Sequence, residues 1–360
     1  MKMPKQKSEL GFTLLELMVS MAVGLIVMGA MVSLFKTGMD SAIVVTQRAE
    51  TQQNMRAAID LMVKDISMAG AGLPSGGIQL PAGSGSSVSL FGCDQSGACH
   101  VPGDAYPTSN YMYGIIPGYK NGVEANAVVA AAPPPAFDDS ITSIYADYNF
   151  PLWEYDVTFP VPGSGTAITL TPNANYVPAP PFPNAAGGVQ VGDLIMLSNS
   201  LGTAVGEVTN ITTTGIDFAD SDALNINQNG AGSNNIAKIS TGANTIAYRL
   251  FAVTYYLTVP ANGENPRLMR QVNGLSPTPV ADNIINLQFS YDIYNSTSSS
   301  PSLEANQANP LGVGDSPNLI QKINIVVMGQ SMLHTGARSQ NLYLATSVSA
   351  RNMAFRNRYQ

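Results

Sequence analysis

Residues 12–35 read FTLLELMVSMAVGLIVMGAMVSLF, and this stretch decides the fold. It contains a single charged residue, Glu16, among apolar and small side chains. A helix of about 20 apolar residues crosses a hydrocarbon core of about 30 Å, so the stretch is long enough to span a membrane. The sequence therefore predicts a transmembrane helix at 12–35.

The residues before this helix form a basic leader, MKMPKQKSELG, with Lys2, Lys5 and Lys7. A basic flank stays on the cytoplasmic side of a membrane, so the rest of the chain is expected outside. A secretory signal has its small-residue cleavage site after the apolar region, whereas Gly11 stands before it here. We expect cleavage after Gly11, which removes residues 1–11 and leaves Phe12 as the new N-terminus.

Glu16 is the unusual residue of the apolar stretch. A carboxylate inside a bilayer costs roughly 3 kcal/mol on insertion scales and is by default functional. Cleavage after Gly11 would create a cationic amine on Phe12, one helical turn away. The partner amine belongs either to the same chain or to a neighbouring copy, where the pair would set the axial register of a helix bundle. The alternative is a carboxylate that snorkels to the membrane interface near the helix start.

The segment GFTLLELMVSMAVGLIVMG at 11–29 resembles the class III signal of type IV prepilins and type II secretion pseudopilins. In that family, prepilin peptidase cuts after the glycine and methylates the new N-terminal phenylalanine. The matching positions are Gly11, Phe12 and Glu16. The resemblance implies an inner-membrane precursor with a periplasmic head, which later joins a pilus on the cell surface. Its partners there are other major and minor pilins, through their N-terminal helices.

Residues 36–69 are expected to continue the helix out of the membrane and into the head. They contain no proline. Apolar residues recur at helical spacing, which predicts an amphipathic helix that packs against the head. These residues are Ala42, Val45, Ala49, Met55, Ile59, Met62 and Ile66. Glycine and proline in GAGLPSGG at 70–77 should end the helix, which at 1.5 Å per residue would be about 85 Å long.

The remainder of the chain predicts a β-rich head. Runs at 245–259, 283–294 and 319–332 alternate apolar and polar residues between turn residues, which indicates an antiparallel sheet at 191–360. Residues 70–190 are richer in proline and glycine and predict a loop-rich insert with short strands. The expected fold class is α+β and pilin-like, with one long N-terminal helix packed on an antiparallel β head that carries large loop insertions.

The order of segments in the second half resembles PilW-type minor pilins and, more distantly, the J-type minor pseudopilin. The segments are VGDLIML at 191–197, RLMR at 267–270, VADNIINLQFSYD at 280–292, KINIVVMG at 322–329 and SVSARN at 347–352. The similarity is one of order more than of identity. It does not extend to residues 75–190.

Composition excludes several classes of function. The formal net charge is −7 and only 11% of residues are charged, which argues against a nucleic-acid-binding surface. No phosphate-binding glycine loop is present. The only two histidines are His100 and His334. No nucleophile motif frames them, so we expect no enzymatic activity and no cofactor.

Cys93 and Cys99 are the only cysteines, and they predict one local disulfide in an oxidising compartment. The alternative is a metal or haem site with His100, but haem attachment requires C-x-x-C-H and two spaced thiols with one histidine make a poor zinc set. Acidic and amide side chains in DSDALNINQNG could offer oxygen ligands to calcium, but the spacing breaks the EF-hand pattern and favours a polar turn. These side chains are Asp220, Asp222, Asn225 and Asn227.

Three functions compete at this point. The first is a minor pilin that helps to initiate pilus assembly and is displayed at the tip. The second is a minor pseudopilin of type II secretion. The third is a tip adhesin that binds a surface ligand through residues 70–190, where aromatic side chains could form an adhesive patch or pack in the core. These aromatic residues are Tyr111, Tyr113, Trp153 and Tyr155.

Overall fold

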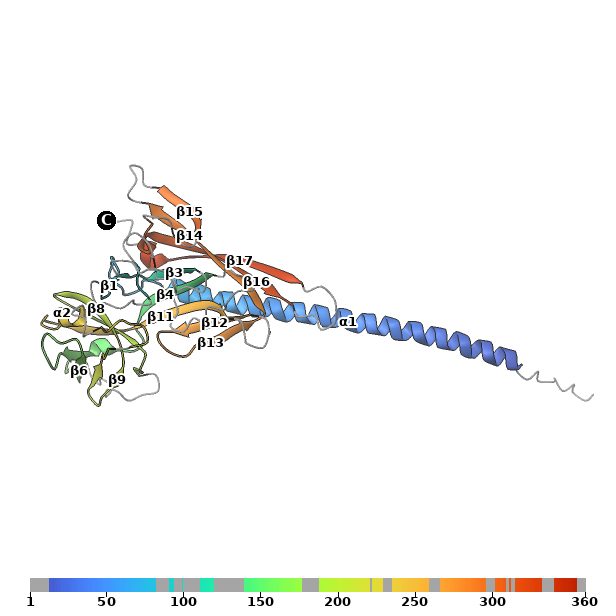
Figure 1. The fold of residues 1–360 in the computed structure, drawn as a ribbon, viewed down its shortest axis with the longest axis horizontal. Coiled ribbons are helices and arrows are strands. Elements are labelled where there is room, and N and C mark those ends of the chain that lie inside the picture. The colour runs from blue at the N-terminus through green and yellow to red at the C-terminus, as the bar shows by residue number, and fades with distance from the viewer. Residues whose placement is uncertain are drawn as a thin grey trace, which may run out of the picture. The chain divides into compact units, whose positions relative to one another are not determined.

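The computed structural model describes most of the chain. The described residues are 13–81, 91–93, 99, 111–119, 139–176, 188–220, 222–228, 235–258, 266–295, 302–308, 311, 315–331 and 340–354. One long helix precedes antiparallel β-sheets (Figure 1), which confirms the expected α+β fold class. The chain divides into two compact units. The first comprises 1–50 with 331–340, and the second, which we call the head, comprises 51–330 with 341–360.

Helix α1 spans Leu14–Ser67 and runs for 54 residues without a break. It ends at Ser67, close to the expected residue 69, because the backbone turns left-handed just beyond it. Gly70 has a φ of +78° and Gly72 a φ of +74°, a conformation that glycine adopts at helix C-termini without steric cost. The Gly70 N–H then donates to the Ile144 carbonyl at 2.8 Å. The chain therefore passes directly from the helix onto a strand of the head.

The head buries one face of the C-terminal part of α1. Met55, Ile59, Met62 and Ile66 are all buried in one apolar cluster with the sheets, which confirms that these positions pack against the head. The expectation was wrong for the earlier positions Ala42, Val45 and Ala49, which are exposed. The reason is that the buried positions of α1 begin only at Thr51, where the head begins.

The described strands form four antiparallel sheets. The largest has the order β13-β12-β11-β4-β3, with β7 pairing β11 and β8 pairing β7. Its strands are β3 (Ile115–Tyr119), β4 (Asp139–Asp147), β7 (Leu194–Asn199), β8 (Gly202–Glu207), β11 (Ile246–Thr258), β12 (Arg267–Val272) and β13 (Thr278–Asp282). The second sheet has the order β15-β14-β16-β17. Its strands are β14 (Ile284–Asn295), β15 (Ser302–Ala308), β16 (Ile320–Gln330) and β17 (Asn341–Ser349).

The remaining elements are smaller. A third sheet has the order β5-β6-β10-β9 and a fourth pairs β1 with β2. These strands are β1 (Ile78–Gln79), β2 (Tyr111–Met112), β5 (Tyr155–Thr158), β6 (Ala167–Pro172), β9 (Asn210–Ile211) and β10 (Gly215–Asp217). The short helices are η1 (Leu152–Glu154), α2 (Asn235–Ile239), η3 (Pro317–Leu319) and α3 (Arg351–Ala354).

Strands from both sides of residue 190 share the largest sheet. β3 and β4, which precede this residue, pair through β4 with β11, which follows it. β11 is one strand of 13 residues, and β7 and β8 pair antiparallel as a hairpin. Two strands of residues 70–190, β3 and β4, are thus built into the same sheet as strands of the C-terminal half. The glycine- and proline-rich runs at 131–138 and 177–187 lie outside the described residues.

Asp65 joins α1 to the largest sheet by directional bonds. Its side chain is 6% exposed, and its Oδ2 accepts from Arg270 Nε at 2.8 Å and from the Tyr255 hydroxyl at 2.6 Å. Its Oδ1 accepts from the Tyr145 hydroxyl at 3.3 Å. Burial, followed by the negative charge of Asp65, raises the pKa of both tyrosines, so both remain hydrogen-bond donors. Three strands, β4, β11 and β12, therefore hold one carboxylate of the helix.

A second ion pair lies within the sheet itself. Arg249 on β11 donates through Nε to Asp147 Oδ2 on β4 at 2.9 Å, and its Nη1 lies 3.8 Å from Asp193 Oδ2. The guanidinium also stands over the Phe150 ring, 4.8 Å from the centroid. Burial raises the pKa of Asp193 in this setting. The Arg249–Asp147 pair therefore helps to fix the register of β4 against β11, which apolar side chains alone specify less strictly.

Replacing Asp65 should destabilise the head. We expect Asp65→Asn to lower the free energy of unfolding by about 3 kcal/mol, because Arg270 then keeps its charge without its charged partner. Chemical denaturation of the full chain in detergent, followed through the single tryptophan, measures this. Asp60→Asn, an exposed acid on the same helix, is the matched control and should change stability by less than about 0.5 kcal/mol. Equal effects of the two variants would contradict the role given to Asp65.

Candidate functional site

The first turn of α1 is closed by a reciprocal pair of hydrogen bonds between Thr13 and Glu16. The Glu16 N–H donates to Thr13 Oγ1 at 3.3 Å, and the Thr13 N–H donates back to Glu16 Oε2 at 3.0 Å. The Thr13 hydroxyl also donates to Oε2 at 3.0 Å. This arrangement is a capping box, which satisfies amide donors that the first turn of a helix leaves without intrahelical partners.

The capping box gives Glu16 a local role that the sequence interpretation overlooked. The signal was present, because T-x-x-E just before an apolar run is the pattern of a capping box. Gly11 and Phe12, the expected cleavage site and new N-terminus, lie outside the described residues. The carboxylate of Glu16 is thus held at the helix start by its own chain.

The N-terminal part of α1 exposes apolar side chains on all sides. Leu14, Leu25 and Leu34 are between 68% and 79% exposed. No residue in the most apolar stretch of this helix is buried. This helix is the one among the described residues that is long and apolar enough to cross a membrane. Such a surface is stable only in lipid or against other apolar helices.

Hydroxyl groups along this part of the helix bond back to the helix's own backbone. The Ser20 hydroxyl donates to the Leu17 carbonyl at 2.9 Å, and the Thr37 hydroxyl to the Ser33 carbonyl at 3.0 Å. The Ser41 hydroxyl donates to the Thr37 carbonyl at 2.8 Å. Because these polar groups are satisfied within the helix, they add little cost to burial in lipid or in a helix bundle.

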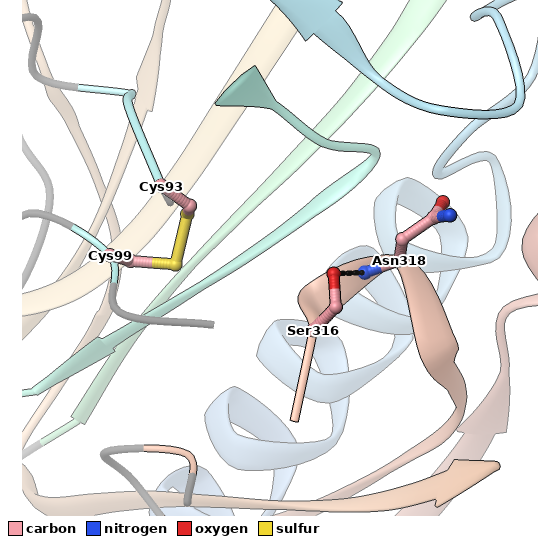
Figure 2. The surroundings of a disulfide bond; sticks show 4 residues. All are labelled: Cys93, Cys99, Ser316 and Asn318. Atoms are coloured by element: carbon pink, nitrogen blue, oxygen red, sulfur yellow. Dashed lines mark hydrogen bonds between the residues drawn. A yellow bond between two sulfur atoms is a disulfide. The ribbon is translucent and has the colours of Figure 1, made fainter. Parts of the chain in front are cut away.

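Cys93 and Cys99 are joined by a disulfide, as Figure 2 shows. Cys93 is fully buried in an apolar cluster of the head, and its backbone N–H and carbonyl both bond to Tyr111, at 2.8 and 2.7 Å. Figure 2 also shows Ser316, whose Oγ accepts the Asn318 N–H at 3.3 Å at the start of η3. The disulfide therefore joins Cys99 to Cys93, which is itself hydrogen-bonded to Tyr111 of β2, and its role is structural. His100 and His334 lie outside the described residues.

Side chains of the possible calcium loop bind the loop's own backbone. Asp222 is buried and accepts the N–H groups of Ile226 and Asn227 at 2.6 and 3.2 Å. The Asn227 amide bridges the backbone of Glu207 in both directions, at 2.9 Å each. Among the residues that the structure describes, no group of three or more His, Cys, Asp or Glu side chains is placed to hold a metal ion.

Glu207 is a buried carboxyl beside this loop that the sequence analysis did not single out. It is 3% exposed at the end of β8, and its Oε2 accepts the Leu224 N–H at 2.8 Å. Burial raises the pKa of Glu207 to about 8, and a hydrogen bond with Asp222 adds to the rise. At neutral pH the side chain is therefore largely protonated and can share its proton with Asp222.

The aromatic residues considered for an adhesive patch separate into two groups. Trp153 is partly exposed and packs with Tyr148 and Tyr248, with ring centroids 6.2 and 6.1 Å away. Tyr155 and Tyr113 are instead buried, each 4% exposed, and belong to the core. The structure thus leaves Trp153 partly exposed and places Tyr113 and Tyr155 in the core. Tyr111 is half-buried and stacks on Tyr113, with ring centroids 6.1 Å apart.

A comparison with protein families finds the prokaryotic N-terminal methylation motif at residues 6–32. The motif covers the expected cleavage site, the capping box and the apolar start of α1. It supports a type IV pilin-like or pseudopilin-like precursor with a class III signal, which implies processing by prepilin peptidase and a membrane anchor. Comparisons with curated proteins and with solved structures give no match.

The buried carboxyl should make stability fall as pH rises. The pKa of Glu207 is raised on folding, so its contribution is full below the ordinary value of 4.5 and is lost as pH rises through about 8. We expect Glu207→Gln, which mimics the protonated acid, to flatten the fall between pH 5 and pH 9. Denaturation midpoints across this range measure the effect.

The control for this pH series is Glu50→Gln, which removes an exposed glutamate of α1. It should leave the slope unchanged. A Glu207→Gln variant with the same slope as the parent chain would show that Glu207 is ionised in the folded state at neutral pH.

Proposed function

We propose that this chain is a minor pilin of a type IV pilus, that it helps to initiate pilus assembly, and that it is displayed at the pilus tip. The observation that carries the proposal is the methylation motif, which is continuous with a helix of 54 residues whose first part is apolar on every side. Such a helix suits two successive environments, the lipid bilayer and a bundle of sibling helices. The proposed action is assembly and not catalysis.

The proposed sequence of events begins with insertion. Prepilin peptidase removes residues 1–11 on the cytoplasmic side and methylates Phe12. The helix then leaves the bilayer and exchanges lipid contacts for contacts with neighbouring helices, so its apolar surface stays out of water throughout. The head, held in the periplasm by the same helix, reaches the cell surface with the filament.

Glu16 has two parts in this proposal. Its capping box closes the helix start in the membrane, and its charge attracts the Phe12 amine of the same chain or of a neighbour. The charge is needed only for the second part, because a glutamine at the third helix position also completes a capping box. The two parts are therefore separable by substitution.

One prediction of the proposed function concerns processing of the N-terminus. Mass spectrometry of the mature chain should find an N-terminus at methylated Phe12, and Gly11→Val should leave the leader in place because the peptidase site is blocked. Glu9→Gln, a change within the leader, is the control and should be processed normally. A mature chain that keeps Met1, or that begins beyond residue 35, would refute the pilin assignment.

Another prediction separates the charge of Glu16 from its role in the Thr13–Glu16 capping box. Glu16→Gln and Glu16→Val should both insert into the membrane but fail to enter filaments, because neither attracts an amine. Thr13→Ala keeps the charge and loses only the cap, at about 1 kcal/mol of helix stability, so it should still assemble. Sheared filament fractions and membrane fractions, probed for this chain, give the readout. Normal incorporation of Glu16→Gln would reduce Glu16 to a capping residue.

Deletion of this chain in its native bacterium distinguishes a pilus subunit from a type II secretion pseudopilin. Loss of this chain should reduce surface pili and leave protein secretion unchanged. The reverse outcome would assign the chain to a secretion system, whose pseudopilins share the motif at residues 6–32.

A further inference from the structure

Three aromatic side chains gather at the surface of the head, where the chain leaves β4. Tyr148 follows β4 directly, Trp153 lies in η1 and Tyr248 lies on β11. Their ring centroids are between 6.0 and 6.2 Å apart in all three pairs, so each ring contacts the other two. Tyr148 is 52% exposed, and Trp153 and Tyr248 are half-buried. We call these three residues the aromatic patch.

The surrounding structure holds the patch in one form. Leu152 of η1 is fully buried in an apolar cluster of the head and anchors the turn that carries Trp153. The Tyr148 side chain rests against Gly72, where a Cβ atom would approach Tyr148 Oη to 2.5 Å. The fold therefore sets the positions of these rings before any ligand arrives, which lowers the entropy cost of binding.

The polar groups of the patch have no partner within the part of the chain that the structure describes. The indole N–H of Trp153 and the hydroxyls of Tyr148 and Tyr248 make no hydrogen bond there. By contrast, the hydroxyls of Tyr145 and Tyr255 both bond to a carboxylate of α1. Tyrosine hydroxyls and tryptophan N–H groups usually find a partner when they are buried. The patch therefore offers donors and acceptors to a ligand.

A fourth aromatic residue, Tyr176, borders the patch. It is 44% exposed, and its N–H donates to the Asn173 carbonyl at 3.1 Å. Asn173 in turn donates its N–H to the Glu154 carbonyl of η1 at 3.0 Å. Burial, followed by the nearby hydroxyls of Tyr148 and Tyr176, raises the pKa of Tyr248. The Tyr248 hydroxyl is therefore protonated at neutral pH and able to donate.

The charges around the patch argue against an anionic ligand. Residues 147–156 and 173–176 read DYNFPLWEYD and NANY, without a lysine or an arginine. Arg249 lies beside them, but its Nε donates to Asp147 at 2.9 Å. The Glu154 carboxylate has no hydrogen bond or ion pair among the described residues. A phosphate, a sulfate or a nucleic acid would therefore meet an unpaired negative charge here.

The form of the patch argues against two other ligands. A quaternary ammonium binds in a cage of rings that stand around it, whereas these rings contact one another and leave no opening between them. A stable protein partner buries roughly 800 Å² on each side. Three aromatic side chains offer about 600 Å² even when fully exposed, and two of these are half-buried. The exposed area suits a ligand with the size of a sugar ring.

We propose that the aromatic patch binds a neutral saccharide. A sugar ring has an apolar face of C–H groups, which the rings of Tyr148 and Trp153 would cover, and hydroxyls at its edge that both donate and accept. The phenol hydroxyls and the indole N–H of the patch are matching partners for these hydroxyls. A neutral sugar also needs no cation. This binding activity goes beyond the proposed role in assembly and does not depend on it.

Tryptophan fluorescence tests the proposal directly. Trp153 is the single tryptophan of the chain, so its emission, excited where tyrosine does not absorb, reports on the patch alone. The full chain is purified in a polyoxyethylene detergent, which has no sugar head group, and titrated with cellotriose, maltotriose and chitotriose. At least one of them should change the emission saturably, because a stacked sugar removes water from the indole. No saturable change with any of the three would overturn the proposal.

Substitutions of Tyr148 show whether the response comes from the patch. Tyr148→Ala removes its most exposed ring and should raise the Kd about tenfold. Tyr148→Phe keeps the ring and should stay within about threefold of the parent chain. Tyr343→Ala removes an exposed tyrosine of β17, in another sheet, and is the matched control, which should bind like the parent. Thermal unfolding checks the fold of all three variants. Equal affinities of Tyr148→Ala and the parent chain would contradict the site.

Other ligand classes are tested on the same signal with choline chloride, inorganic phosphate and a proline-rich peptide. None of them should give a saturable change that Tyr148→Ala removes. Saturation by one of these, without saturation by the saccharides, would assign the patch to that ligand and overturn the proposal.

Saccharide binding and the pilin assignment fail separately. Binding is measured on the purified chain and needs no filament. If the chain never enters filaments, the titration still decides what the patch binds. If no saccharide binds, the results on processing and on filament entry are unaffected.

Discussion

The contact between Asp65 and Arg270 is the constraint on which the head depends. Burial of Met62 and Ile66 holds α1 to the sheets, but apolar burial is non-directional and would tolerate rotation or sliding of the helix. A carboxylate that accepts from an arginine and two tyrosines tolerates neither, because each partner comes from a different strand. The Asp65 carboxylate therefore fixes the C-terminal part of α1 to β4, β11 and β12 by directional bonds.

A single helix thus serves two kinds of surroundings. Before Thr51, its described side chains are exposed except for the half-buried Val44 and Gln47, and from Leu14 to Phe35 they are mostly apolar. From Thr51 onward, one face is buried and the rest is polar. The change occurs within one helix assignment, Leu14–Ser67, which contains no proline.

Much of the fold could be predicted from local patterns, and the remainder depends on distant residues. Alternation predicted β11, β14 and β16 close to their observed bounds, because each has one buried face. The same reasoning was wrong at Val45, since spacing shows that a face is apolar but not where the head begins. The capping box was visible in the sequence and was overlooked. The partners of Asp65 were not visible, because Tyr255 and Arg270 lie 190 and 205 residues away.

The scarcity of charge in this chain makes the position of each charge informative. With only 11% charged residues, the head relies on asparagine and hydroxyl groups, and asparagines occupy left-handed turns such as Asn244, Asn273 and Asn283. Edge strands β13, β15 and β3 nevertheless each contain an acid or a proline, where an open edge would otherwise invite pairing. A uniformly uncharged surface would leave all of these edges bare.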